Sequence, residues 1–457
     1  IVHQLTVLRP SLAELLEQLL VAFTPEQAAQ AQEVARQRYM AWRRGKKGVP
    51  GADVTALQML NPHQGKGIRA TKPVRTRVEN VKVFWLCEWL KWLGLFTAGL
   101  ARSLPTGGGS RDYKLYVLEP EYIPLHLHRQ VLKDFNLRWG TQGSIKLDIL
   151  ALIQYADTYL EHIERAHAGK RSFPSQLLQQ LLTPAHAISG FHVAYFKSLG
   201  QAHALASLSF LAVPPWIKVA VPQELGHWRG ILADFRAVAR GIEEEDAVAE
   251  LLQGYRAFLS TGDIWRLLEF TGELAVLAMQ EAARTGRRRH PYLSRIATRT
   301  LEEVIPLTEK AYSMILETEG FRHLAAAIRQ STISLQYLPR ERRQFEVRYG
   351  LAQELLRKSL YAEELIAALA EFVASYNREN ARQHERQAQG RHGEAASFRR
   401  RNITTQDLEE VVKLIDNYGP EVVGKLLVAY GYARVPRTDT GPEAGDTAEA
   451  ETGEETA

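Results

Sequence analysis

The sequence predicts a mainly α-helical protein with a minor β element, built as an α+β amino-terminal body followed by a carboxyl-terminal helical bundle. From Ser144 onward, apolar residues recur at helical spacing through most of the chain. Arg111–Pro124 instead shows the two-residue alternation that is typical of a strand, and Gly107–Gly109 before it suits a turn. A length of 457 residues favours two or three domains.

Two helices are expected near the amino terminus, over Ser11–Phe23 and Thr24–Arg44. Thr24 suits the N-cap of the second helix, and Gln27 completes a capping box with it. Gly45 is a natural end for that helix, because glycine readily adopts the left-handed conformation that follows a last turn.

The segment Gly45–Arg77 interrupts this helical chain with five glycines, three prolines and a large excess of Lys and Arg over a single Asp. A structureless stretch of this length is uncommon in a compact domain unless it is functional. Glycine lets a backbone approach a ligand closely, and ammonium and guanidinium groups contact phosphates. The segment is therefore predicted to be a loop that handles nucleic acid.

The longest apolar run, Val81–Leu104, is broken by charges and is predicted to be a buried helix rather than a membrane span. Trp85, Trp89, Trp92 and Phe96 recur along it at three- and four-residue spacing, on one helical face. Such a face could stack bases, but aromatic side chains bury so much area that we expect these four in the core.

Further helices are predicted along the rest of the chain. They cover Ser144–Gly169, Pro174–Leu182, Pro184–Leu211, Glu224–Arg240, Glu244–Leu259, Gly262–Arg284, Leu301–Thr318, Arg322–Leu335 and Arg343–Asn380. Thr404 then caps a helix with Asp407 at its third position, and Pro420 starts another helix after Gly419.

These patterns divide the chain into a body over residues 1–300, a helical bundle over residues 301–437 and an acidic tail over residues 438–457. The tail has seven acidic residues and no basic one, which predicts disorder. The remainder holds 57 Lys and Arg against 45 Asp and Glu, and the sequence pI is about 9.1. This surplus favours a polyanionic partner such as nucleic acid.

Two shorter basic segments share the chemistry of the Gly45–Arg77 loop. RTGRRRHP carries Arg287, Arg288 and Arg289, and GRHGEAASFRRRN carries Arg399, Arg400 and Arg401. Arginine runs in loops are usually just solvated, but the glycines beside these favour phosphate contacts as well.

A search for catalytic or metal-binding motifs finds little. Cys87 is the only cysteine, so neither an intramolecular disulfide nor a cysteine-based zinc site is possible. His126 and His128 would face one way in an extended segment, but no third ligand has matching spacing. HQGKG lacks the remainder of a P-loop, and no G-x-S-x-G occurs. No metal, no cofactor and no enzymatic activity are expected.

One enzymatic alternative stays open. Arg378 with His384, and Arg386 with His392, have the Arg-x5-His spacing of helical ribonucleases, in which Arg and His act on a scissile phosphate. The amino terminus lacks the basic and small-residue pattern of a signal peptide, so we expect a cytoplasmic protein without a membrane partner.

Several segments together resemble one family. The loop NPHQGKG, the helix EWLKWLGLF, the strand DYKLYVLEPEYI, and the later runs FRHLAAAIRQSTISLQY, VRYGLAQELLRKSL, EELIAALAEFVASYNREN and TTQDLEEVVKLIDNYGPEVVGKLLVAYGYAR resemble the large subunit of type I CRISPR–Cas surveillance complexes (Cascade). The resemblance extends over most of residues 25–435.

The resemblance implies an antiviral-defence protein with a globular body and a helical bundle like the small subunit of related complexes. Such large subunits join a crRNA-bound backbone of other subunits and read the protospacer-adjacent motif on double-stranded DNA. They help to open the duplex, steady the displaced strand and recruit a helicase–nuclease. They are usually not catalytic.

The resemblance and the residue chemistry together point to the Gly45–Arg77 loop. Groups suited to base contacts are Asn61, Gln64, Lys66 and Arg69, and those suited to phosphate contacts are Lys46, Lys47, Lys72, Arg75 and Arg77. Besides the ribonuclease, a second alternative is an all-helical scaffold that binds RNA or protein through its basic face.

Overall fold

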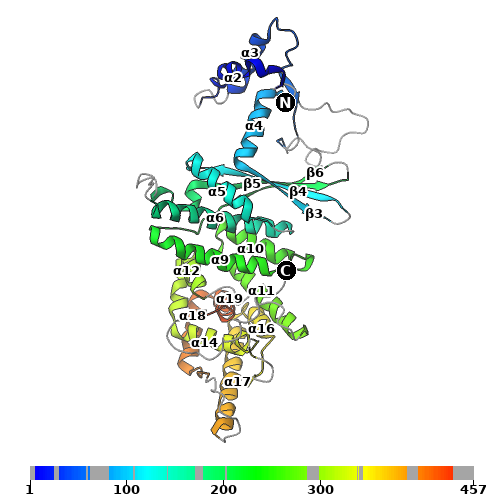
Figure 1. Cartoon of the computed structure of the whole chain (residues 1–457). Helices are drawn as coiled ribbons and strands as arrows, with labels where there is room; N and C mark the ends of the chain where they lie inside the picture. The colour runs from blue at the N-terminus through cyan, green and yellow to red at the C-terminus, as the bar shows by residue number, and fades with distance from the viewer. Residues whose placement is uncertain are drawn as a thin grey trace, which may run out of the picture. The chain divides into compact units, whose positions relative to one another are not determined.

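The fold is mainly α with a minor β element, as predicted (Figure 1). The computed structural model describes residues 6–24, 30–57, 60–61, 82–106, 109–140, 143–169, 179–200, 203–285, 298–336, 338, 343–388 and 400–435. The chain forms two compact units. Unit 1 holds residues 1–137 and 187–211, and unit 2 holds residues 138–186 and 212–457.

A four-stranded sheet is the centre of unit 1 (Figure 1). Its strands follow the order β3-β4-β5-β6, and β3 with β4 and β4 with β5 pair antiparallel. The strands are β3 (Gly99–Pro105), β4 (Arg111–Pro120), β5 (Ile188–Ser198) and β6 (His203–Ala212). The predicted strand is therefore confirmed as β4, and Gly109, with φ of +81°, lies in the β3–β4 turn.

The helices of unit 1 are α2 (Leu12–Leu20), α3 (Ala31–Arg43), α4 (Trp85–Ala98) and α5 (Leu125–Arg138). α5 lies against the sheet, where Phe135 and Phe191 have ring centroids 6.0 Å apart. A second core joins α2, α3 and the start of α4 around Tyr39 and Trp85, both fully buried. The predicted cap at Thr24 involves residues outside the described part, and the described α3 begins at Ala31.

Two predictions for unit 1 were wrong. The segment predicted as a helix over Pro184–Leu211 forms the four-residue helix α8 (Pro184–Ala187), then β5 and β6. The predicted Val81–Leu104 helix ends at Ala98 and continues as β3. β4 pairs with β3 on one side and with β5 on the other, and these pairings satisfy the backbone hydrogen-bonding groups of both strands. Tertiary contacts therefore override the helical propensity of the local sequence.

Unit 2 is built from helices. They are α6 (Ser144–Ala168), α9 (Leu225–Gly241), α10 (Ala249–Thr261), α11 (Ile264–Thr285), α12 (Thr298–Thr308), α13 (Ser313–Glu317), α14 (Glu319–Ser331), α15 (Ile333–Gln336), α16 (Leu351–Lys358), α17 (Ala362–Ala388), α18 (Thr405–Tyr418) and α19 (Pro420–Gly431). The predicted capping box of α18 is confirmed: the Asp407 amide donates to Thr404 Oγ1, and Thr404 N donates back to the Asp407 carboxylate.

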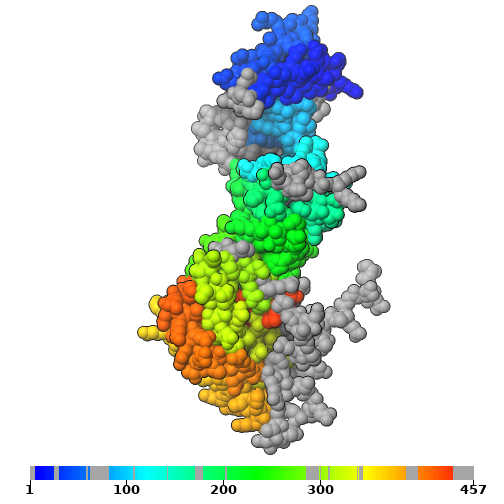
Figure 2. Space-filling view, turned by 90° about the vertical axis from the view of Figure 1, so that its left-hand side faces the viewer, coloured from blue at the N-terminus to red at the C-terminus, as the bar shows by residue number. Residues whose placement is uncertain are grey.

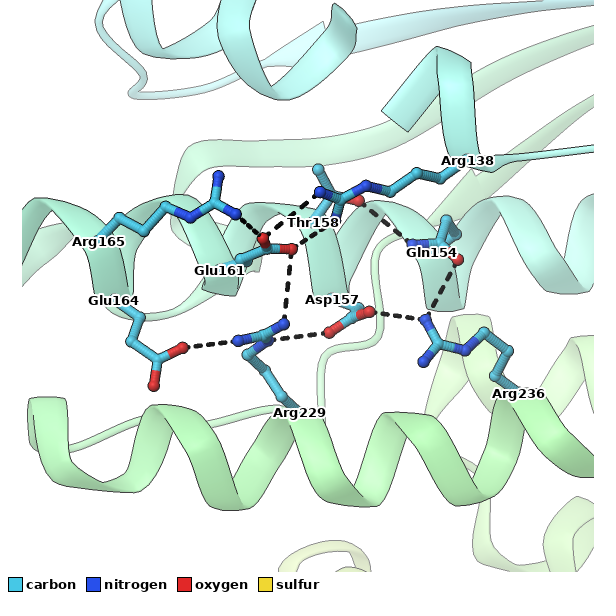
Figure 3. A network of polar contacts seen from close by, with 9 residues as sticks. All are labelled: Arg138, Gln154, Asp157, Thr158, Glu161, Glu164, Arg165, Arg229 and Arg236. Atoms are coloured by element: carbon cyan, nitrogen blue, oxygen red, sulfur yellow. Dashed lines mark hydrogen bonds and ion pairs between the residues drawn. The ribbon is translucent and has the colours of Figure 1, made fainter. Parts of the chain in front are cut away.

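Helix α6 is buried along most of its length and carries acidic side chains into unit 2 (Figure 3). Asp157 accepts from Arg229 and Arg236 of α9 at 3.1 and 2.7 Å, and Glu161 pairs with Arg138 and Arg165. The hydrogen bond from Arg138 holds the pKa of Glu161 below its usual range. Charge pairing therefore joins α6 to α9, which the helical periodicity alone did not reveal.

The division into units differs from the predicted boundary at residue 300, which falls inside unit 2. Helices from both sides of that position share one core, because α11 packs against α16 and α19, while α10 packs against α6 and α11. The two strands β5 and β6 conversely belong with unit 1, since they complete its sheet.

Candidate nucleic-acid interface

A cationic hollow lies at the carboxyl end of α3, and we use that name for it below. Its lining residues are Arg36, Gln37, Met40, Ala41, Arg43, Arg44, Gly45 and Lys46. Arg43 Nε donates to the Val49 carbonyl at 3.2 Å, and Lys46 Nζ lies 3.5 Å from the centre of the Trp42 ring. The predicted phosphate contacts Lys46 and Lys47 are both exposed, and of the two only Lys46 lines the hollow. The hollow therefore presents several cations on one small surface of unit 1.

The Gly45–Arg77 segment is closed at its base by a short strand pair. β1 (Asp53–Thr55) pairs antiparallel with β2 (Lys82–Phe84), with Asp53 opposite Phe84 and Thr55 opposite Lys82. The two ends of residues 56–81, which include 56–77 of that segment, therefore lie side by side at Thr55 and Lys82. Of the predicted contact residues within it, Gln64, Lys66, Arg69, Lys72, Arg75 and Arg77 lie outside the described residues.

Asn61, predicted to contact bases, is buried and forms part of the loop base instead. Its side chain is engaged at both ends: Nδ2 donates to Glu88 Oε1 at 2.8 Å, and Oδ1 accepts from Lys91 Nζ. Glu88 also accepts from the Leu57 amide at 3.2 Å. Burial by itself would raise the pKa of Glu88, but the hydrogen bonds from Asn61, Lys91 and Leu57 hold it below its usual range. The structure assigns Asn61 an anchoring role, since a base edge cannot reach an amide that is 2% exposed.

Replacing Glu88 with Gln should loosen this anchor. Glutamine keeps the shape, but it loses the charge paired with Lys91 and one of its two acceptor oxygens. We expect the free energy of unfolding of this part of unit 1 to fall by about 1–3 kcal/mol. Hydrogen exchange at the Leu57 amide, whose acceptor is Glu88, should become faster. Hydrogen exchange followed by NMR measures this. The control is Glu33→Gln, at an exposed acid whose partner among the described residues is Gln37. Equal exchange in both variants would contradict the anchor.

The aromatic face of α4 is only partly core. Trp85 is fully buried as predicted and Trp89 is half-buried, but Trp92 and Phe96 are 37% and 68% exposed. Their rings contact each other edge to face at 5.0 Å. The prediction was wrong for this pair because the first turns of α4 enter the core of α2 and α3, whereas its later turns run beyond that core.

The two other basic segments lie mostly outside the described residues, which exclude Arg287, Arg288, Arg289 and Arg399. Arg401 is exposed and donates to His323. Arg400, predicted as a phosphate contact, is instead buried: its side chain is 0% exposed, stacks on Phe345 at 3.5 Å and pairs with Glu379. Burial lowers the pKa of Arg400 to about 10. Its guanidinium group contacts Phe345 and Glu379 inside the bundle, where a phosphate cannot reach it.

α17 carries a row of arginines, called the arginine stripe below, of which the sequence analysis named Arg378 and Arg386 only as partners of histidines and not as a row. The stripe consists of Arg378, Arg382 and Arg386, all exposed, which form no ion pair with any residue that the structure describes. Spacing of four residues puts successive guanidinium groups on one face, about 6 Å apart along the axis. On the opposite side of α17, Tyr376, Asn380 and Gln383 are buried. A periodicity count restricted to Arg and Lys would have found the stripe.

The residues of the first ribonuclease pair, Arg378 and His384, do not converge. Arg378 and His384 belong to the same unbroken helix, and a separation of six residues turns their side chains about 120° apart. His392, the partner of Arg386 in the second pair, lies outside the described residues. His128 is also structural, because it is buried and its Nε2 bonds to the Thr97 carbonyl at 2.9 Å. Across the described ranges, no cluster of His, Cys, Asp and Glu could hold a metal ion.

Comparison with protein-family models finds no match, and comparison with curated proteins finds no similar sequence. Among the helices that the structure describes, none combines the length and the apolar character needed to cross a membrane.

Proposed function

We propose that the chain is the non-catalytic large subunit of a crRNA-guided DNA surveillance complex. In this role it recognises the protospacer-adjacent motif, assists duplex opening, stabilises the displaced strand and docks a helicase–nuclease. The observation that carries the nucleic-acid part is the arginine stripe of α17. The identity of the complex rests on the sequence resemblance described above.

The stripe has the geometry of a phosphate-binding surface. Its three guanidinium groups project from one rigid helix, and Tyr376 fixes that helix by donating to Gln330 at 2.7 Å. The carboxyl half of α17 extends past the neighbouring helices of unit 2, which leaves it accessible (Figures 1 and 2). Backbone contacts of this kind position a strand without reading its sequence, as stabilisation of a displaced strand requires.

The cationic hollow adds a second candidate contact, in unit 1. It lies at the start of the Gly45–Arg77 segment, whose Lys and Arg residues are suited to duplex DNA. In this proposal Lys46 and Lys47 bind phosphates, while Gln64, Lys66 and Arg69 contact bases in the groove. Asn61 has no part in base contacts, because it anchors the loop.

The stripe is tested by changing Arg378, Arg382 and Arg386 together to Gln. Loss of three phosphate contacts should weaken binding of a single-stranded DNA oligonucleotide about 10- to 100-fold near 0.1 M salt. It should also reduce the slope of log K against log salt by about 2. Fluorescence anisotropy at several salt concentrations measures both quantities.

The matched control changes Arg240, Arg357 and Lys413 to Gln. These three cations are also exposed in unit 2 but lie on three different helices, so the change in net charge is identical while no stripe is removed. The control should bind like the unaltered protein. Equal weakening in both triple variants would show a general charge effect and would reject the stripe as a site.

The identity of the complex is tested by purifying the chain from a host that also expresses CRISPR repeats and backbone subunits. Sequencing of the bound RNA should recover repeat-derived crRNA. Purification without any nucleic acid would favour the scaffold alternative, which the exposed Trp92 and Phe96 also suit as a protein contact.

A further inference from the structure

The arginine stripe leaves three positive charges unpaired on a surface where acids are available. Glu371 and Glu385 are exposed on the same helix, yet neither pairs with Arg378, Arg382 or Arg386. Glu379, which lies between them in the sequence, pairs with the half-buried Arg348 and the buried Arg400. The described part of the helix therefore does not neutralise its own stripe.

The chain carries a second polyanion besides any nucleic acid. Residues 438–457 contain seven acidic residues and no Lys or Arg. The acids are Asp439, Glu443, Asp446, Glu449, Glu451, Glu454 and Glu455. Like a short oligonucleotide, this tail offers a linear series of negative charges, so it complements the stripe in sign and in form.

The place from which the tail departs is tied to α17 by a short series of contacts. The last described residues follow α19, where Arg329 of α14 donates through Nε to the Ala433 carbonyl at 2.8 Å. The next residue of α14, Gln330, accepts from Tyr376 of α17. Tyr376 precedes Arg378 by two residues. Two adjacent residues of α14 thus connect the origin of the tail to α17, on the side of that helix opposite the stripe.

The tail is long enough to run from Val435 to the stripe on α17. The 22 residues beyond Val435 span up to about 70 Å when fully extended. A tethered polyanion also acts at a high effective concentration, on the order of millimolar for a short linker, so even weak pairing is substantially populated.

We propose that the acidic tail binds the arginine stripe of the same chain and competes there with nucleic acid. The inference rests on the proposed function, because it gives the nucleic-acid site a built-in competitor. A short or non-specific anion displaces the tail poorly, whereas a long strand with many phosphates displaces it well. The tail thereby raises the concentration of nucleic acid that is needed to occupy the stripe.

The test uses the full-length protein with all seven tail acids changed to Asn or Gln, so that the length of the tail is kept. A labelled peptide of residues 438–457 is added to this neutral-tail protein at low salt, and its anisotropy is measured. The peptide should bind, and binding should be lost in the neutral-tail protein that also carries R378Q, R382Q and R386Q. The variant with R240Q, R357Q and K413Q should retain it.

A second measurement follows nucleic acid. The neutral-tail protein should bind a single-stranded oligonucleotide about tenfold more tightly than the native protein near 0.05 M salt, and the difference should vanish as salt screens the tail. With the stripe substituted, neutralising the tail should have no effect. Absence of peptide binding, or binding that survives substitution of the stripe, overturns the proposal.

The two proposals fail separately. If the peptide binds the stripe but no oligonucleotide does, the tail contact holds and the nucleic-acid function fails. If oligonucleotides bind the stripe with equal affinity in the native and neutral-tail proteins, the function holds and the competition by the tail is rejected.

Discussion

Replacing Asp157 with Ala should lower the free energy of unfolding of unit 2 by about 3–5 kcal/mol, one of the two largest effects we expect in this protein. The Asp157 side chain is 7% exposed and faces two arginines of α9. Arg236 is only 26% exposed and would keep a partly buried charge with the Gln154 amide as its acceptor, whereas Arg229, 30% exposed, would keep Glu161 and Glu164. Breaking a buried pair from one side costs far more than the pair contributes.

Hydrogen exchange with mass spectrometry on peptides from α6 and α9 measures this effect without assuming that both units unfold together. The control is Arg165→Gln in the same network. Arg165 is 59% exposed, so its loss should cost less than about 1 kcal/mol. A cost of the same size in both variants would contradict the role assigned to Asp157.

Replacing Arg400 with Ala should destabilise the carboxyl-terminal part of unit 2 by a comparable amount, about 3–5 kcal/mol. Its guanidinium stacks on Phe345, lies 5.4 Å from the Tyr376 ring centre and donates to the Gln330 carbonyl. Alanine removes these contacts, opens a cavity and leaves Glu379 with Arg348 alone. Arg400→Lys should recover little of this stability, because an ammonium group can neither stack on Phe345 nor donate the hydrogen bonds of a planar guanidinium group.

Urea denaturation followed by exchange in peptides of α14 and α17 reports this loss. Arg401→Ala is the neighbouring control, since Arg401 is exposed and contacts only His323 among the described groups. Should Arg401→Ala destabilise the bundle as much as Arg400→Ala, the burial of Arg400 would not be the cause.

Local sequence patterns predicted the helix boundaries near the carboxyl end correctly but missed two strands. The boundaries around Thr404, Gly419 and Pro420 were correct, because caps and helix ends are set by a few neighbouring residues. β5 was missed because its backbone partners lie on β4, 68 to 83 residues earlier in the sequence, and β6 was missed with it because β6 borders the sheet only through β5. No local window contains that information, which is why apolar residues spaced like a helix were read as one.

The candidate site shows the same limit at the level of single residues. Arg400 and Arg401 are neighbours of one type, yet one is in the core and the other is at the surface. Asn61 looked suited to base contacts until Glu88, 27 residues later, proved to be its partner. Composition predicted a basic surface, but whether a given cation or amide is available depends on contacts that only the fold reveals.

The β1–β2 pair has a consequence for how this protein can diversify. Because the strands close the intervening residues at one point, lengthening that insertion changes the fold very little: doubling a loop costs only about 0.6 kcal/mol in closure entropy. The length and chemistry of residues 62–81 can therefore change while the strand pair and the Asn61–Glu88 anchor stay constant. Unit 1 can in this sense accept insertions of different length and composition between Asn61 and Lys82.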